Sequence, residues 1–192
     1  FVSLSFHPVK AITTGEGGAI LTNNKSYDKK LKLLRSHSII RSDKTYWKYK
    51  VNSLGYNFRL SDISCALGIS QLKKLNKFIK RRREIAKIYD TFFFRYSFCK
   101  TPPIISKQFN SYHLYPLLID FKKIKIKKDI FIKKFLKTNI KLQVHYIPIN
   151  TQPYYKKRYG LQKKIFKNTN FFFEREISLP IFYDLSNTQI KY

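Results

Sequence analysis

Alternating apolar and polar positions at the start of the chain predict two strands joined by a glycine turn. Residues 1–6 alternate and are β-prone, and Pro8 ends that strand because proline has no N–H for a sheet ladder. Residues 11–14 and 19–22 flank residues 15–18, Gly-Glu-Gly-Gly, a hairpin signal that holds three of the chain's six glycines. In a chain so poor in glycine, we expect those positions to need backbone conformations that other residues avoid.

Helical spacing follows this turn. Residues 26–36 predict a short basic helix with its apolar residues near one face. Residues 36–54 are polar and aromatic and predict a loop. Its single tryptophan, Trp47, is consistent either with packing at a dimer interface or with covering an active site.

A longer helical pattern occupies the middle of the chain. Ser61 suits an N-cap, and Asp62 behind it is favourable at the positive end of a helix dipole. From Asp62 to about Phe93 the apolar residues recur at helical spacing. Gly68 and Ser70 predict a break of this run into two helices.

Strands and helices alternate after Thr101-Pro102-Pro103, which marks a boundary. In the second of the expected strands, alternate apolar residues share one face. The expected strands are 112–120, 140–147 and the extended segment 177–182, and the expected helices are 128–138, 154–159, 163–174 and one starting near Ser186. This alternation predicts an α/β fold.

The high positive charge of the chain suggests nucleic-acid binding, but the distribution of the basic residues argues against it. Lys and Arg number 39 against 11 Asp and Glu, a net charge of +28, and such charge attracts phosphates. The 30 lysines outnumber the 9 arginines, and successive thirds of the chain hold 11, 16 and 12 basic residues. A protein that recognises phosphates and base edges would favour arginine over lysine and would hold its basic residues in a cluster. We therefore attribute the charge to AT-rich codons and expect no nucleic-acid partner, with a basic nucleic-acid-binding module as the alternative.

Simple counts bear on the remaining classes. No apolar run approaches the about 20 residues of a membrane span, and the start shows no signal-peptide pattern. Cys65 and Cys99 are too few for a disulfide framework and lack partners at metal-ligand spacing, so we expect no metal and a cytoplasmic protein with reduced thiols. The chain contains no methionine and begins with Phe1, from which we expect a fragment lacking its N-terminal part.

The candidate chemistry lies at the start of the chain. Lys10 follows a predicted strand and precedes the glycine turn, so its backbone is held in place. A lysine that forms a Schiff base needs such a mount. Ser5 lies five residues upstream, and a turn at Pro8 would bring its hydroxyl toward the same place, where a hydroxyl and backbone N–H groups suit a phosphate. By itself, one lysine among 30 is more often a surface lysine.

Several segments, in order, carry a resemblance to one family. They include Ser5-Phe6-His7-Pro8-Val9-Lys10, Leu34-Arg35-Ser36-His37, Leu54-Gly55-Tyr56-Asn57-Phe58-Arg59, Ser111-Tyr112-His113-Leu114-Tyr115-Pro116, Val144-His145-Tyr146-Ile147-Pro148 and Leu179-Pro180. Together they resemble the DegT/DnrJ/EryC1/StrS sugar aminotransferases, pyridoxal-phosphate (PLP) enzymes of fold type I, over nearly the whole chain. The first and fifth segments are most similar to the branch that aminates a UDP-4-keto-6-deoxy-N-acetylhexosamine in pseudaminic acid synthesis.

The resemblance implies roles for five residues. Lys10 would hold pyridoxal 5'-phosphate as a Schiff base and then act as the acid and base that moves a proton. Ser5 would hydrogen-bond the cofactor's phosphate, and Asn57 would reach the phosphate of the partner subunit's cofactor. Arg59 and His145 would contact the sugar nucleotide. From the residues alone, His145 is equally consistent with a partly exposed structural histidine.

The resemblance also implies an architecture and partners. The fold would be a partial fold type I aminotransferase: residues 1–60 end the PLP-binding large domain, 61–100 form linking helices, and 101–192 form a truncated small α/β domain. The enzyme would be a homodimer with shared active sites, using a UDP-sugar and, as amino donor, glutamate. The family's N-terminal half supplies the acid that pairs with the pyridine nitrogen, so we expect this chain alone to be inactive. A regulatory relative without chemistry is a further alternative, which Lys10 and Ser5 disfavour.

Overall fold

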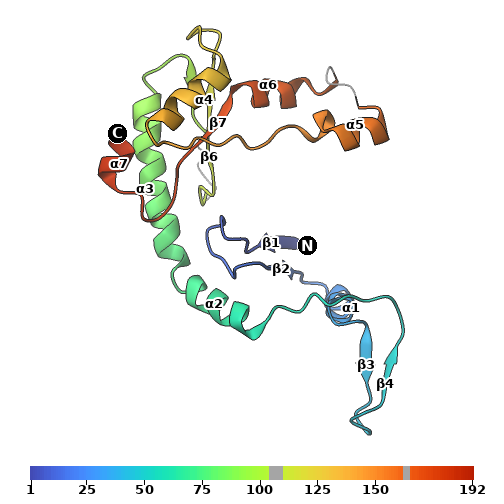
Figure 1. The fold of residues 1–192 in the computed structure, drawn as a ribbon. Coiled ribbons are helices and arrows are strands. Elements are labelled where there is room, and N and C mark those ends of the chain that lie inside the picture. Colours follow the sequence, from blue (N-terminus) through green and yellow to red (C-terminus); the bar gives the residue numbers. More distant parts are fainter. Residues whose placement is uncertain (104–109, 162–164) are drawn as a thin grey trace. The chain divides into compact units, whose positions relative to one another are not determined.

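The computed structural model describes residues 1–103, 110–161 and 165–192 and divides the chain into two compact units (Figure 1). Unit 1 is Phe1–Asn76 and unit 2 is Lys77–Tyr192. Each unit is described by itself below. The domain boundaries expected after residues 60 and 100 stay predictions.

Unit 1 opens with an antiparallel pair whose partners differ from those expected. Strand β1 (Val2–Ser5) pairs with β2 (Gly18–Leu21), with Ser5 opposite Gly18. The predicted strand at 11–14 is wrong, since those residues belong to the loop 6–17. The reason is that the Phe6 carbonyl accepts both the Thr14 N–H (3.0 Å) and the Thr13 hydroxyl (2.9 Å), which folds the segment back onto the end of β1.

The next two elements of unit 1 are a predicted helix and an unpredicted hairpin. Helix α1 (Lys25–Arg35) confirms the basic helix, and its N-cap Asn24 accepts from two backbone N–H groups. Within the predicted loop, β3 (Ile39–Arg41) and β4 (Tyr49–Val51) pair antiparallel, so a loop throughout 36–54 is wrong. Three residues per strand are too short for an alternating pattern to stand out from the polar residues around them.

Two helices follow, and they separate later than the sequence predicts. Helix α2 (Asp62–Leu72) confirms Ser61 as its N-cap, and α3 (Leu75–Phe93) continues after Lys73 and Lys74. A break at Gly68 and Ser70 is therefore wrong, because both lie inside α2. Gly68 has a packing reason instead: a Cβ there would lie 2.8 Å from the Thr14 Cγ2 atom of the lysine-bearing loop.

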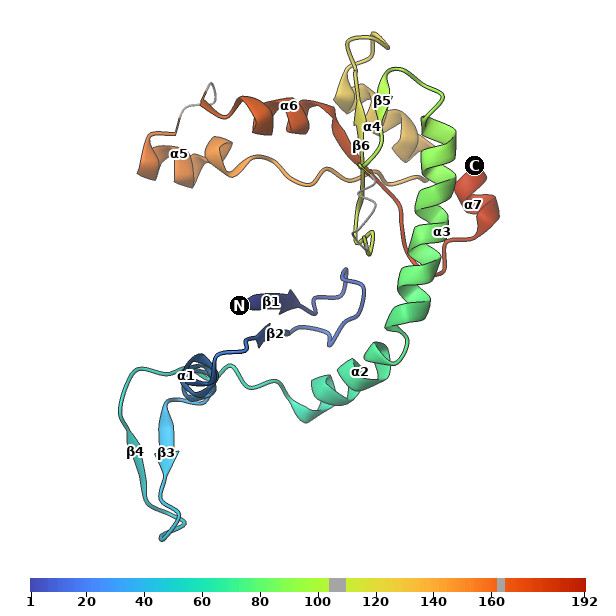
Figure 2. The same cartoon turned by 180° about the vertical axis from the view of Figure 1, so that it is seen from behind.

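Unit 2 is built on a three-stranded antiparallel sheet in the order β5-β6-β7. Figure 1 labels β6 and β7, and Figure 2, the view from behind, labels β5 and β6. The structure confirms the expected helices and two of the expected strands, 112–120 and 177–182, with small shifts of their ends. Residue 163, the expected start of one helix, lies outside the described residues. The elements are β5 (Cys99–Lys100), β6 (Tyr115–Ile119), β7 (Glu176–Leu179), α4 (Lys128–Lys137), the 3₁₀ helix η1 (Ile149–Thr151), α5 (Pro153–Tyr159), α6 (Lys167–Arg175) and α7 (Asn187–Lys191). Ser186 caps α7 in a capping box with Gln189.

One predicted strand of unit 2, at 140–147, does not form. Only Gln143 pairs, as an isolated bridge with Ser178 of β7. The ladder ends there because the His145 N–H donates to the side chain of Glu176 at 2.9 Å. The prediction that the alternate apolar residues of this segment share one face is also wrong, since Leu142 is buried (6% exposed) whereas Tyr146 is 69% exposed.

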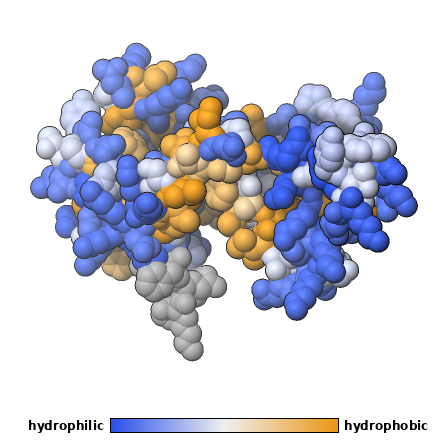
Figure 3. All heavy atoms as spheres, turned by 90° about the horizontal axis from the view of Figure 1, so that it is seen from below, coloured by the Kyte–Doolittle hydropathy of each residue, from blue (hydrophilic) through white to orange (hydrophobic). Residues whose placement is uncertain are grey.

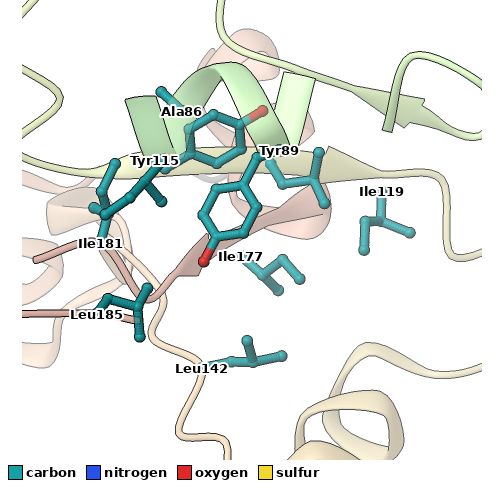
Figure 4. Close-up of a cluster of buried hydrophobic side chains, with 10 residues drawn as sticks. Ala86, Tyr89, Tyr115, Ile119, Leu142, Ile177, Ile181 and Leu185 are labelled. Atoms are coloured by element: carbon teal, nitrogen blue, oxygen red, sulfur yellow. The ribbon is translucent and has the colours of Figure 1, made fainter. Parts of the chain in front are cut away.

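The hydrophobic core of unit 2 lies between α3 and the sheet. Residues 115, 117 and 119 of β6 are buried in strict alternation, and the Tyr115 and Tyr89 rings pack at a centroid distance of 5.0 Å (Figure 4). The Tyr89 hydroxyl donates to the Pro180 carbonyl at 2.7 Å. The buried apolar cluster is Ile85, Ala86, Tyr89, Tyr115, Leu117, Ile119, Leu142, Ile177, Ile181 and Leu185.

A buried arginine joins the segments around this core. Arg82 of α3 is 7% exposed and donates to the carbonyls of Tyr112 (3.0 Å), His113 (3.3 Å) and Ile181 (2.8 Å). Burial lowers the pKa of Arg82, yet a guanidinium stays charged. All three bonds come from Nη1, so this nitrogen binds two chain segments to one helix, and Tyr112 and Ile181 in those segments lie 69 residues apart.

Unit 1 has no comparable core. Within residues 1–76, all of them described, only Thr14 and Ser38 are buried. Large apolar side chains on both strands of its first sheet are exposed, for example Val2 at 54% and Ile20 at 52%. Figure 3 shows one face of the molecule, on which hydrophobic side chains lie exposed among hydrophilic ones. Unit 1 therefore lacks the apolar burial that stabilises a domain.

We expect residues 75–192 to fold alone and residues 1–74 not to, because the apolar core of the described residues lies entirely in unit 2. Urea titration followed by far-ultraviolet circular dichroism checks this. The 75–192 polypeptide should unfold cooperatively, at the same midpoint as the main transition of the full chain. A cooperative transition of 1–74 alone, or none in 75–192, would contradict the prediction.

Core tyrosines should make the stability of unit 2 fall at alkaline pH. Burial raises the pKa of Tyr89 from 10.0 to about 12, so between these values the unfolded chain loses the proton first. The free energy of unfolding then falls as pH rises, by at most about 1.4 kcal/mol per pH unit per tyrosine. Burial raises the pKa of Tyr115 too, in the same direction.

Tyr89→Phe should therefore flatten that pH dependence while lowering stability by about 1 kcal/mol at neutral pH through loss of the bond to Pro180. Urea unfolding of both proteins at several pH values from neutral to strongly alkaline measures the two slopes. The exposed Tyr146→Phe serves as the matched control, with an unchanged slope. Equal slopes for wild type and Tyr89→Phe would refute the assignment.

Candidate functional site

The loop 6–17 holds Lys10 between two fixed ends. The Phe6 N–H donates to the Gly17 carbonyl at 2.9 Å, which extends the β1–β2 ladder by one bond and closes the loop. Inside the loop, the Lys10 N–H donates to the His7 carbonyl at 2.9 Å, so a tight turn starts at His7 and contains Pro8. The Lys10 side chain is partly buried. Its backbone is thus fixed by hydrogen bonds on both sides, as a reacting amine needs.

Two glycines of this loop have the special conformations expected of them. Gly15 has φ +82° and Gly17 φ +150°, both in the region that L side chains rarely adopt. A Cβ on Gly17 would also lie 2.8 Å from Leu60 Cδ1. The predicted need for backbone freedom is confirmed at these two positions.

Ser5 ends β1, directly before the loop. It lies opposite Gly18, where a Cβ would lie 2.6 Å from the Leu4 carbonyl oxygen, so the two strands approach closely. Ser5 is exposed. Its hydroxyl is therefore accessible at the end of the strand, where the loop begins.

Asn57 and Arg59 lie on a segment pinned to the end of α1. The Tyr56 N–H donates to the Leu34 carbonyl at 2.7 Å, and the Phe58 N–H to the Arg35 carbonyl at 2.9 Å. The Tyr56 and Phe58 rings stack at 4.9 Å, while Asn57 and Arg59 alternate with them and are exposed. The segment is thus rigid in its backbone and carries two polar side chains toward solvent.

His145 belongs to unit 2 and is held by two residues that the sequence analysis missed. Its N–H donates to Glu176 Oε2 at 2.9 Å, and its Nδ1 lies 2.7 Å from Ser178 Oγ. The Ser178 hydroxyl in turn donates to Glu176 Oε1 at 2.6 Å. Glu176 is 0% and Ser178 3% exposed. The sequence signal that could have identified them is a glutamate and a serine on either side of an isoleucine in a strand.

The five predicted site residues therefore fall into both units. Ser5, Lys10, Asn57 and Arg59 lie in unit 1, and His145 lies in unit 2. Their predicted roles stay predictions. Among the residues that the structure describes, no three His, Cys, Asp or Glu side chains form a group able to hold a metal ion. No helix in the described part of the chain is long and apolar enough to cross a membrane.

Comparison with known proteins decides the family. The model of the DegT/DnrJ/EryC1/StrS aminotransferase family matches residues 1–192. The chain belongs to this family. It is 41% identical over 188 residues to the UDP-4-amino-4,6-dideoxy-N-acetyl-beta-L-altrosamine transaminase of Campylobacter jejuni, a match that covers 98% of this chain and 49% of that protein. The family expected from the sequence is confirmed.

Solved structures of family members agree. PseC of Helicobacter pylori, an aminotransferase of pseudaminic acid biosynthesis, has a TM-score of 0.91 at 36% identity, covering 98% of this chain and 50% of that one. The PLP form of the sugar aminotransferase Spr1654 of Streptococcus pneumoniae has a TM-score of 0.86 at 28% identity, covering 99% and 48%. The chain thus spans about half the length of the relatives it matches, and the expected partial α/β aminotransferase fold is confirmed.

Proposed function

We propose that this chain is the C-terminal half of a PLP-dependent sugar-nucleotide aminotransferase. The reaction would move an amino group, from glutamate, to C4 of a UDP-4-keto-6-deoxy-N-acetylhexosamine in pseudaminic acid or surface-glycan biosynthesis. The observation that carries the proposal is Lys10 on a loop whose two ends are joined by the backbone hydrogen bond between Phe6 and Gly17, in a chain whose family is one of aminotransferases. The names of the Campylobacter and Helicobacter relatives support the substrate.

The residues of unit 1 fit pyridoxal phosphate by their chemistry. The cofactor has an aldehyde, which an amine such as that of Lys10 can hold, and a phosphate, which the Ser5 hydroxyl and backbone N–H groups can bind. When bound, it supplies an electron sink for transferring the amino group. Lys10 would hold the cofactor at rest and, once released, carry the proton between the cofactor and the substrate carbon.

The other three residues would contact partners. Asn57 and Arg59 project from a pinned backbone toward solvent, which suits contacts to a second subunit and to the sugar nucleotide. We propose a homodimer in which Asn57 reaches the phosphate of the partner's cofactor. His145 would hydrogen-bond the sugar nucleotide. A cytoplasmic location, expected from Cys65 and Cys99, is also part of the proposal.

The lysine is tested in a hybrid enzyme. The half of the Campylobacter jejuni transaminase that this chain does not match is joined to residues 1–192 in one polypeptide. With PLP, glutamate and the keto-sugar nucleotide, the hybrid should aminate the sugar. Lys10→Ala should lower the rate by about a hundredfold to ten-thousandfold and abolish the visible absorbance of the lysine-bound cofactor, since both the mount and the proton carrier are lost.

Lys29→Ala is the matched control, because Lys29 is an exposed lysine of α1 in the same unit. It should keep both the rate and the spectrum. An unchanged spectrum in Lys10→Ala would refute the assignment of the lysine. The 192-residue chain without the added half should show no amination, and detectable amine transfer by it would refute the proposal that it is half of an active site.

A further inference from the structure

Strand β7 has one polar side, formed by Glu176 and Ser178, to which the proposed function assigns no role. Ile177 points into the core, so Glu176 and Ser178, at alternate positions, lie on the opposite side of the strand. Both are almost completely buried. A buried carboxyl group is costly unless every polar contact is made, so this arrangement calls for a partner.

The partner is His145. The Glu176 carboxylate accepts from the Ser178 hydroxyl at 2.6 Å and from the His145 N–H at 2.9 Å, one bond to each oxygen. Ser178 Oγ then lies 2.7 Å from His145 Nδ1. The carboxylate, the hydroxyl and the imidazole therefore form an unbroken chain of hydrogen bonds that ends at a partly buried histidine.

The direction of this chain follows from counting protons. A carboxylate only accepts, so the single proton of the Ser178 hydroxyl is committed to Glu176. Ser178 Oγ can then offer only a lone pair to the ring, and Nδ1 must carry the proton in that bond. In the neutral ring, the other nitrogen, Nε2, is left with its lone pair and can accept a hydrogen bond.

Lys128 of α4 interacts electrostatically with Glu176. Lys128 of α4 is partly buried and donates to the Phe173 carbonyl. Burial lowers the pKa of Lys128, while the charges of Glu176 and Asp129 act in the opposite direction. Attraction to Glu176 therefore favours the charged ammonium form of Lys128.

We propose that Glu176 and Ser178 are positioning residues that hold His145 as the Nδ1–H tautomer, so that Nε2 accepts a hydrogen bond from a hydroxyl or amide N–H of the sugar nucleotide. The substrate part rests on the proposed function, whereas the tautomer depends only on unit 2. The carboxylate thus specifies, through one hydroxyl, a binding group that prefers donors on the sugar.

Nitrogen-15 NMR of the 192-residue chain tests the tautomer. The chain has four histidines, so His145→Gln assigns the signals of that ring. At about pH 9, where a histidine is ordinarily neutral, two-bond correlations identify the protonated nitrogen. We expect Nδ1 to be protonated in the wild type, and Nε2 protonated instead would overturn the proposal whatever the variants do.

The same NMR measurement on Glu176→Gln is a more stringent test, because this substitution should reverse the tautomer of His145. The glutamine amide satisfies the His145 N–H only by turning its oxygen toward it, which directs its NH₂ group at Ser178. The Ser178 hydroxyl then donates to Nδ1, and the ring proton moves to Nε2. Ser178→Ala should release the preference for Nδ1–H, and Ser178→Thr, which keeps a hydroxyl, should retain it. Nδ1–H retained in both Glu176→Gln and Ser178→Ala would overturn the relay.

Kinetics of the hybrid enzyme separate this inference from the proposed function. Ser178→Ala should raise KM for the sugar nucleotide by about two- to tenfold, the effect of one hydrogen bond. It should leave KM for glutamate unchanged, and Ser178→Thr should restore the sugar KM. An unchanged sugar KM would overturn the binding role of His145. A hybrid without activity, beside the expected tautomer, would refute the proposed function and leave the relay in place.

Discussion

Burial of one face of β6 against α3 is the constraint on which the ordered half of the molecule depends. Tyr115 and Leu117 of β6 pack against Ile85, Ala86 and Tyr89 of α3, and these are among the least exposed side chains of the described residues. Because β7 pairs with β6 over four residues, this packing also sets the position of Glu176 and Ser178. The hydrogen-bonded chain from Glu176 to His145 is therefore positioned by the packing of the hydrophobic core. Arg82 holds the segment that follows β7 through its bond to the Ile181 carbonyl.

Unit 1 positions its chemistry by a different kind of force. The loop of Lys10 is held by backbone hydrogen bonds at Phe6 and Gly17 and by a close approach of Gly17 to Leu60, without apolar burial of its own. Local bonds can define a loop's shape, but they contribute little net free energy of folding. To hold a reacting lysine rigidly, unit 1 thus needs apolar contacts that it does not make within itself. This agrees with the length of the Campylobacter jejuni relative, of which the matched segment makes up 49%.

Helices were predictable where their ends carry side-chain signals. Ser61 and Ser186 accept from the first backbone N–H groups of α2 and α7 as their types suggest, because capping is a local interaction within three residues. Strand pairing was not predictable, since it joins distant residues. The segment 140–147 alternates like a strand, yet it leaves the ladder at His145 for a side chain 31 residues away. Gly68, which looked like a break, is instead a close contact to Thr14.

The sequence by itself determined the family, the α/β class, the helices and the lysine with its glycine loop, because these depend on local order of residue types. Tertiary structure alone decided which strands pair, that only unit 2 has a core, and that Glu176 and Ser178 join His145. The physical reason is the same in each case. Burial removes water from groups that lie far apart in the chain, and a buried polar group then takes the partner that the packing brings to it.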